Sequence, residues 1–173
     1  MKYLGKYEDL ACSLSQWLAD EMNGKGTAAS VAIVQNDTLL AAFTAGQSGT
    51  IEPCITDLYN IGSVSKVYCA ASIMRLAEQN RVDLDAPVIN YLPHFQMKDP
   101  RYKFITIRML LNHTSTLPGS NYRNIMTTQW YHREYERELY VYWRDSTLKA
   151  EPGAFSVYCN EGFELAMLIA FKR

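Results

Sequence analysis

The strongest constraint on this chain is an apolar stretch, residues 67–77, in which only Ser72 and Arg75 are clearly polar. A helix that is apolar on nearly every side is expected in the interior of a fold. Ser63 and Lys66 precede it, and their spacing places both side chains on one helical face. A buried lysine is costly unless it is paired or loses its proton. The pattern therefore indicates a Ser–Lys nucleophile pair, with the lysine accepting the hydroxyl proton near a helix N-terminus.

Two simpler interpretations compete with this one. Ser63 could be an ordinary N-cap, and Ser-x-x-Lys is short enough to occur by chance. A second copy runs from Ser146 to Lys149, but no apolar helix follows it. We therefore favour the first copy as the functional one.

The composition is that of a globular protein. The chain has 173 residues, 48% of them hydrophobic and 20% charged, which indicates one domain or part of a larger one. The net charge is −1 and there is no basic run, so nucleic acid is not an expected partner. The N-terminus lacks a signal peptide pattern, and no apolar run approaches the thickness of a bilayer. We expect a cytoplasmic protein without a membrane segment.

The cysteines and histidines do not suggest a metal centre. The four cysteines form no Cys-x-x-Cys pair, and the three histidines show no ligand spacing. We expect no metal site and mostly buried thiols.

The patterns predict strands first and helices afterwards. Both expected strands, which look largely buried, surround Asn36-Asp37 as a hairpin. One helix is expected before them and several after them, one of which is capped by Thr106. The aromatic residues near Trp143 indicate either a packing face or the rim of a substrate cleft. The expected helices cover residues 4–22, 63–79, 86–91, 105–113, 128–148 and 161–171, and the expected strands cover 28–34 and 38–46.

A second candidate motif is Tyr158-Cys159-Asn160. In an extended segment Tyr158 and Asn160 lie on the same side. A tyrosine beside a serine and a lysine can carry a proton to a leaving group, and an asparagine can bind both a lysine and a substrate amide. The alternative is a buried tyrosine followed by an asparagine that starts a helix.

Together, these segments resemble the superfamily of class C beta-lactamases, penicillin-binding DD-peptidases and related esterases. The resemblance covers nearly the whole chain from about residue 10. It rests on six stretches in the family's order: residues 59–66 (YNIGSVSK), 82–88 (VDLDAPV), 91–93 (YLP), 105–115 (ITIRMLLNHTS), 117–119 (LPG), and 152–160 (PGAFSVYCN).

The resemblance implies an α+β fold, with an antiparallel sheet flanked by helices and a helical lobe. It implies a single partial domain, in which residues 1–60 carry the N-terminal helix and first strands and residues 61–173 form the helical lobe. Ser63 resembles the acyl-forming nucleophile, Lys66 its proton partner, and Tyr158 the general base and acid. Asn160 resembles a residue that contacts substrate and lysine. The substrate would be a beta-lactam, a D-amino acid peptide or an ester, and no cofactor is implied.

Some features depart from the family pattern. Its third motif would lie beyond residue 173, and with it further strands of the sheet, so we expect impaired activity in this chain. Two alternatives stay open: a pseudo-enzyme that binds or is acylated without turnover, and a fragment that associates through an open sheet edge. Thr116 replaces a frequent glycine, and Cys159 is an unusual neighbour for Tyr158 that could serve as a backup nucleophile. We assign no chemistry to His113. A Ser–His–Asp hydrolase is disfavoured, because the chain has no Gly-x-Ser-x-Gly motif.

Overall fold

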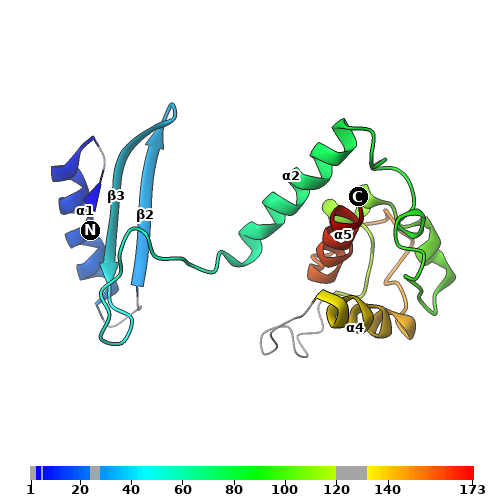
Figure 1. The fold of residues 1–173 in the computed structure, drawn as a ribbon. Helices are drawn as coiled ribbons and strands as arrows, with labels where there is room; N and C mark the ends of the chain where they lie inside the picture. Colours follow the sequence, from blue (N-terminus) through cyan, green and yellow to red (C-terminus); the bar gives the residue numbers. More distant parts are fainter. Residues whose placement is uncertain (1–2, 5, 24–27, 120–131) are drawn as a thin grey trace. The chain divides into compact units, whose positions relative to one another are not determined.

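The chain folds as two compact units, Met1–Asn60 and Ile61–Arg173, each with its own core (Figure 1). The structure is a computed structural model. It describes residues 3–4, 6–23, 28–119 and 132–173.

The first unit is a small antiparallel sheet with one helix. The strands follow the order β1-β3-β2, and α1 lies alongside the sheet (Figure 1). The buried hydroxyl of Ser15 on α1 donates to the carbonyl of Thr44 on β3 at 2.6 Å. The elements are β1 (Tyr3–Leu4), α1 (Glu8–Met22), β2 (Ala28–Gln35) and β3 (Thr38–Gly46).

The predicted hairpin is confirmed. Asn36 and Asp37 have φ values of 47° and 61°, and two positive φ angles give the turn whose twist matches that of the flanking strands. The predicted burial of β2 is wrong. Residues of β3 such as Phe43 are buried, whereas β2 is largely half-exposed or exposed, because it lies at the edge of the sheet. The helix predicted from residue 4 begins instead at Glu8, since β1 pairs with β3.

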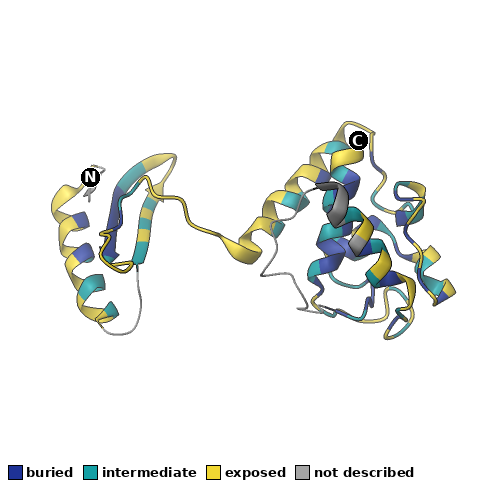
Figure 2. Ribbon diagram, turned by 60° about the horizontal axis from the view of Figure 1, so that its bottom comes forward, coloured by how far each residue is buried: buried dark blue, intermediate teal, exposed yellow. Residues whose placement is uncertain are grey.

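The second unit is helical. Its core forms around α5, whose residues Leu165, Leu168 and Ile169 are fully buried (Figure 2). The rings of Phe95 and Trp143 meet edge to face in this core. The elements are the 3₁₀ turn η1 (Gly62–Val64), α2 (Ser65–Glu78), η2 (Val88–Asn90), η3 (Pro100–Phe104), α3 (Ile107–Leu111), α4 (His132–Arg144) and α5 (Asn160–Lys172).

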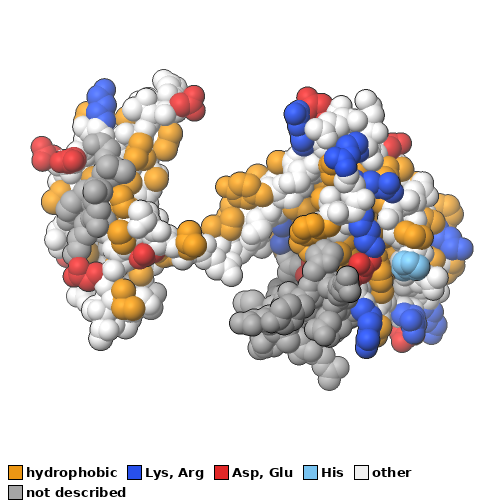
Figure 3. All heavy atoms as spheres, viewed as in Figure 1, with side chains coloured by type: hydrophobic (Ala, Val, Ile, Leu, Met, Phe, Trp, Pro, Cys, Tyr) orange, Lys and Arg blue, Asp and Glu red, His pale blue; other side chains and the backbone are white. Residues whose placement is uncertain are grey.

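The predicted interior position of the helix after Ser63 is wrong. In α2 only Ile73 is buried, and orange side chains are visible along the helix (Figure 3). Val67 is 67% exposed and Tyr68 is 66% exposed. One side of α2 packs against α5. The apolar composition of a helix does not predict how many of its sides are covered by other elements.

Among the other helices, α3 is shorter than predicted and α4 ends earlier, whereas α5 extends one residue beyond the predicted range 161–171 at each end. The side chain of Thr106 accepts a hydrogen bond from the backbone N–H of Met109, so the predicted cap of α3 is confirmed. The helix predicted over 86–91 is a 3₁₀ turn, and the one predicted over 128–148 is α4, with residues 128–131 outside the described residues. Trp143 of α4 is fully buried, which supports a packing face there.

Candidate active site

Ser63 and Lys66 lie at the start of α2. A 3₁₀ turn carries Ser63, and Lys66 follows in the first turn of the α-helix. Gly62 precedes them with a φ of 52°, a conformation that glycine adopts without strain. The Nζ of Lys66 donates to the Oγ of Ser63 at 3.2 Å. The local spacing thus places the hydroxyl and the amine in contact.

Tyr158 and Asn160 reach the same place from the other end of the unit. The segment before α5 is extended at Cys159, with φ −141° and ψ 114°, and α5 begins at Asn160. The phenol of Tyr158 donates to Ser63 Oγ at 2.7 Å. The amine of Lys66 donates to Asn160 Oδ1 at 2.6 Å. All four candidate side chains therefore meet within one unit of the structure.

The charge of Lys66 bears directly on Tyr158. The Nζ of Lys66 lies 4.7 Å from the centre of the Tyr158 ring. The side-chain hydrogen bonds that Tyr158 shares with Lys66, and then with Ser63, lower the pKa of Tyr158, because both contacts favour the phenolate. Tyr158 is 53% exposed, so a small molecule can reach it from solvent. The arrangement can therefore hold a proton acceptor next to an accessible hydroxyl.

His113 also belongs to this cluster, although the sequence patterns assigned it no chemistry. Its ring lies 4.5 Å from that of Tyr158 and 5.2 Å from that of Phe163. Its Nδ1 accepts the backbone N–H of Cys159 at 3.1 Å. Burial, and then the charge of Lys66, lowers the pKa of His113. The position of His113 just after Asn112 in a turn is only a weak signal of a functional role. Its contact with Tyr158 joins distant parts of the chain, so local spacing does not predict it.

Cys159 does not suit the role of a backup nucleophile. Its side chain is buried, and burial together with the nearby Glu161 raises the pKa of the Cys159 thiol to about 12. A buried, protonated thiol is a poor nucleophile. Cys159 instead packs in the core of the second unit.

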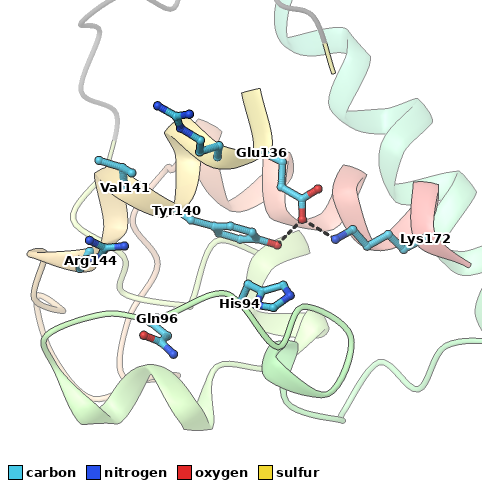
Figure 4. A pocket seen from close by; sticks show the side chains of 8 residues that line it. His94, Gln96, Glu136, Tyr140, Val141, Arg144 and Lys172 are labelled. Atoms are coloured by element: carbon cyan, nitrogen blue, oxygen red, sulfur yellow. Dashed lines mark hydrogen bonds and ion pairs between the residues drawn. The ribbon is translucent and has the colours of Figure 1, made fainter. Parts of the chain in front are cut away.

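Two hollows in the second unit lie away from these four residues. One, of about 590 Å³, is lined by side chains of α4, the end of α5 and the segment around His94; in it Tyr140 and Lys172 both point to Glu136 (Figure 4). The other, of about 660 Å³, lies between α2 and α5. Neither is lined by Ser63, Lys66, Tyr158 or Asn160.

Two further properties of the described residues are their capacity to bind a metal ion and their capacity to span a membrane. Within them, no group of three or more His, Cys, Asp or Glu side chains could hold a metal ion. None of the helices in the described part of the chain has the length and apolar character needed to cross a membrane. On the face of the second unit seen in Figure 3, Lys and Arg side chains are dispersed among apolar ones.

Comparison with known proteins decides the family. The model of the family described as Beta-lactamase matches residues 14–172. The chain belongs to the beta-lactamase family. Among family relatives, the D-alanyl-D-alanine-carboxypeptidase/endopeptidase AmpH of Escherichia coli K12 is 30% identical over 122 residues, which cover 66% of this chain and 30% of AmpH.

Solved structures support the same fold. The D-amino acid amidase of Ochrobactrum anthropi SV3, in complex with D-phenylalanine, is 25% identical, with a TM-score of 0.71. The match covers 94% of this chain and 46% of the amidase. A class C beta-lactamase is 23% identical with a TM-score of 0.71, and the match covers 94% of this chain and 43% of the beta-lactamase chain. The predicted beta-lactamase-like α+β fold is thus confirmed, and the chain spans less than half the length of these relatives.

Proposed function

We propose that this chain carries the acyl-transfer site of a serine hydrolase. Ser63 is the nucleophile, and the substrate carbonyl belongs to a beta-lactam, a D-amino acid peptide or an ester. The observation that carries the proposal is the hydroxyl of Ser63, which contacts the phenol of Tyr158 at 2.7 Å and the amine of Lys66 at 3.2 Å. A weak nucleophile becomes reactive when groups that can take its proton lie within hydrogen-bonding distance.

Each of the four residues has a role in the proposed reaction. Ser63 Oγ forms a bond to the carbonyl carbon while its proton passes to the phenolate of Tyr158, which then protonates the leaving group. Lys66 stabilises the phenolate, and Asn160 orients Lys66 and contacts the substrate. The backbone N–H of Ser63 is one donor to the oxyanion. Water then cleaves the acyl-enzyme by the same proton transfers in reverse.

The names of the relatives suggest the substrate class. AmpH is named as a D-alanyl-D-alanine carboxypeptidase and endopeptidase, and one solved relative is a D-amino acid amidase. Both names refer to D-amino acid derivatives. A carbonyl next to a D-configured carbon is therefore the substrate group that we propose to test first, beside beta-lactams and simple esters.

The first experiment is covalent labelling of the chain by a fluorescent beta-lactam or phosphonate. We expect the wild-type chain to be labelled and Ser63→Ala to lose the label. Ser65→Ala is the matched control, because Ser65 is an exposed serine two residues away and should label as wild type does. Persistent labelling of Ser63→Ala would contradict the assignment of the nucleophile.

The number of product molecules per chain separates a working hydrolase from the second candidate, a pseudo-enzyme. A hydrolase continues to release product after the first turnover, whereas a chain that is acylated and not deacylated releases one product and stops. We propose turnover as the function of the whole protein. A burst of one product per chain without a steady rate would favour the pseudo-enzyme.

The sheet of the first unit supports association as a further candidate property. Within the described residues, β2 is paired on one side, by β3, and its other edge has no strand. Such an edge can pair with another chain. Size-exclusion chromatography over a range of protein concentrations tests this: a concentration-independent monomer would exclude self-association through β2.

A further inference from the structure

One residue, His113, holds the backbone on both sides of Tyr158. The carbonyl of His113 accepts the N–H of Val157 at 2.8 Å, and its Nδ1 accepts the N–H of Cys159 at 3.1 Å. These donors belong to the residues directly before and after Tyr158. The segment that carries the phenol is therefore fixed by a single residue from the turn after α3.

The ring of His113 also supports the ring of Tyr158. The two ring centres are 4.5 Å apart with the planes inclined by 33°, and the ring centre of Phe163 lies 5.2 Å from that of His113. Because Tyr158 is 53% exposed, it has few other neighbours to select one side-chain rotamer. Contact with the imidazole reduces that freedom while the phenol stays open to solvent.

The conformation of His113 matches this task. Its φ is 63°, a left-handed value in which histidine and asparagine are enriched among residues other than glycine. Since Nδ1 accepts a hydrogen bond, the neutral ring carries its proton on Nε2. A protonated ring would donate from both nitrogens and would lose the bond from Cys159. Burial of the ring, and then the charge of Lys66, oppose that protonation by lowering the pKa of His113.

We propose that His113 is a positioning residue for Tyr158: by holding the backbone on both sides and packing against the ring, it directs the phenol to the hydroxyl of Ser63. This rests on the proposed function, in which Tyr158 takes the proton of Ser63. Among the hydrogen bonds of the described residues, those to the hydroxyl of Ser63 come from Tyr158 and Lys66, and none comes from His113. Its loss would let the phenol move away from Lys66 and Ser63.

Two variants separate the acceptor of His113 from its bulk. His113→Asn places an amide oxygen where Nδ1 was and tolerates the left-handed φ, whereas His113→Phe keeps a ring but has no acceptor. We expect His113→Phe to slow labelling of Ser63 by about 10- to 100-fold, because small displacements of a catalytic group cost that much. His113→Asn should recover most of the rate. Circular dichroism and thermal unfolding verify that both variants fold.

A second measurement reports on Tyr158 without any reaction. Tyrosine labelled with ¹³C at Cζ is titrated by NMR, and Tyr158→Phe identifies the signal. In His113→Phe the pKa of Tyr158 should rise towards its ordinary value, since contact with Lys66 and Ser63 lowers it in the wild type. An unchanged titration, or wild-type labelling by His113→Phe, would overturn the proposal.

The two proposals fail in different ways. If the proposed function is wrong, Ser63→Ala is still labelled or Tyr158→Phe is labelled at the wild-type rate, whatever the NMR titration gives. If only the positioning role is wrong, Tyr158→Phe loses labelling while His113→Phe keeps it. A rate loss in His113→Phe with an unchanged titration of Tyr158 assigns His113 a general structural role and rejects the positioning role.

Discussion

The same four-residue pattern occurs twice in the second unit and has two different structures. At Ser63-x-x-Lys66 the hydroxyl and the amine are 3.2 Å apart. At Ser146-x-x-Lys149 the hydroxyl of Ser146 instead donates to the carbonyl of Tyr142 at 3.0 Å, at the end of α4. Among the hydrogen bonds of the described residues, none joins Ser146 to Lys149. The pattern is therefore meaningful only with the right backbone under it.

The backbone differs for identifiable reasons. Ser63 and Lys66 lie on successive helical turns, where residues three apart share a face. The second pattern follows the end of α4, and its middle is fixed to the core. Leu148 is buried and its N–H donates to the carboxylate of Asp99, while the N–H of Lys149 donates to the carbonyl of Thr116. These long-range bonds leave Lys149 exposed, away from its serine.

The largest expected effect distinguishes the two lysines. Lys66→Arg keeps the positive charge, but the planar guanidinium does not fit the contacts that the compact amine makes with Ser63 and Asn160. We expect labelling of Ser63 to slow by at least about 100-fold, because Tyr158 loses the contact that favours its phenolate and with it the proton transfer from Ser63. Lys149→Arg is the matched control and should label as wild type does. Equal labelling of the two variants would remove the functional distinction between the two patterns.

The second effect concerns what holds Leu148 in place. Asp99 is 8% exposed and accepts four hydrogen bonds, from the backbone N–H, Nε and Nη2 of Arg101 and from the N–H of Leu148. Asp99→Asn replaces one carboxylate oxygen by an NH₂ group, which is itself a donor and faces the N–H donors of Arg101 and Leu148. We expect it to lower the free energy of unfolding by about 2–3 kcal/mol, as for hydrogen bonds to a charged group.

Urea unfolding measures this effect, and Glu151→Gln is the control. Glu151 binds the same Arg101 at 2.9 Å but is 71% exposed, so its loss should cost less than about 1 kcal/mol. Arg101 holds the pKa of Asp99 well below its usual value of 3.8. The stabilisation by Asp99 is therefore complete above about pH 4 and falls as the pH drops towards the lowered pKa. A constant difference between wild type and Asp99→Asn over that range would contradict this account.

Sequence patterns could predict what depends on neighbours along the chain. The Asn36-Asp37 turn and the Thr106 cap follow from local chemistry. The contact of Ser63 with Lys66 follows from helical spacing. The meeting of Tyr158 with Ser63 spans 95 residues, and no spacing rule contains it; the family resemblance suggested it.

Features that depend on packing could not be predicted in this way. The apolar composition of α2 indicated a fully buried helix, yet Val67 and Tyr68 are exposed because α5 covers one side only. The sequence patterns assign no role to His113, since its contact with Tyr158 depends on a left-handed turn and on the path of the segment before α5. The burial of α2 and the role of His113 both depend on tertiary contacts, which amino-acid composition does not specify.

The smallest expected effect is at the second serine. Ser146→Ala removes a hydroxyl that bonds a carbonyl at the end of α4, a half-buried position. Hydrogen bonds of this local kind contribute little, so the free energy of unfolding should fall by no more than about 1 kcal/mol. Labelling should equal that of wild type, in contrast to Ser63→Ala, because in the described part of the chain the hydroxyl of Ser146 bonds a backbone carbonyl and not a side chain such as Tyr158. Loss of label in Ser146→Ala, with the fold intact, would mean that the reactive serine had been assigned to the wrong copy of the pattern.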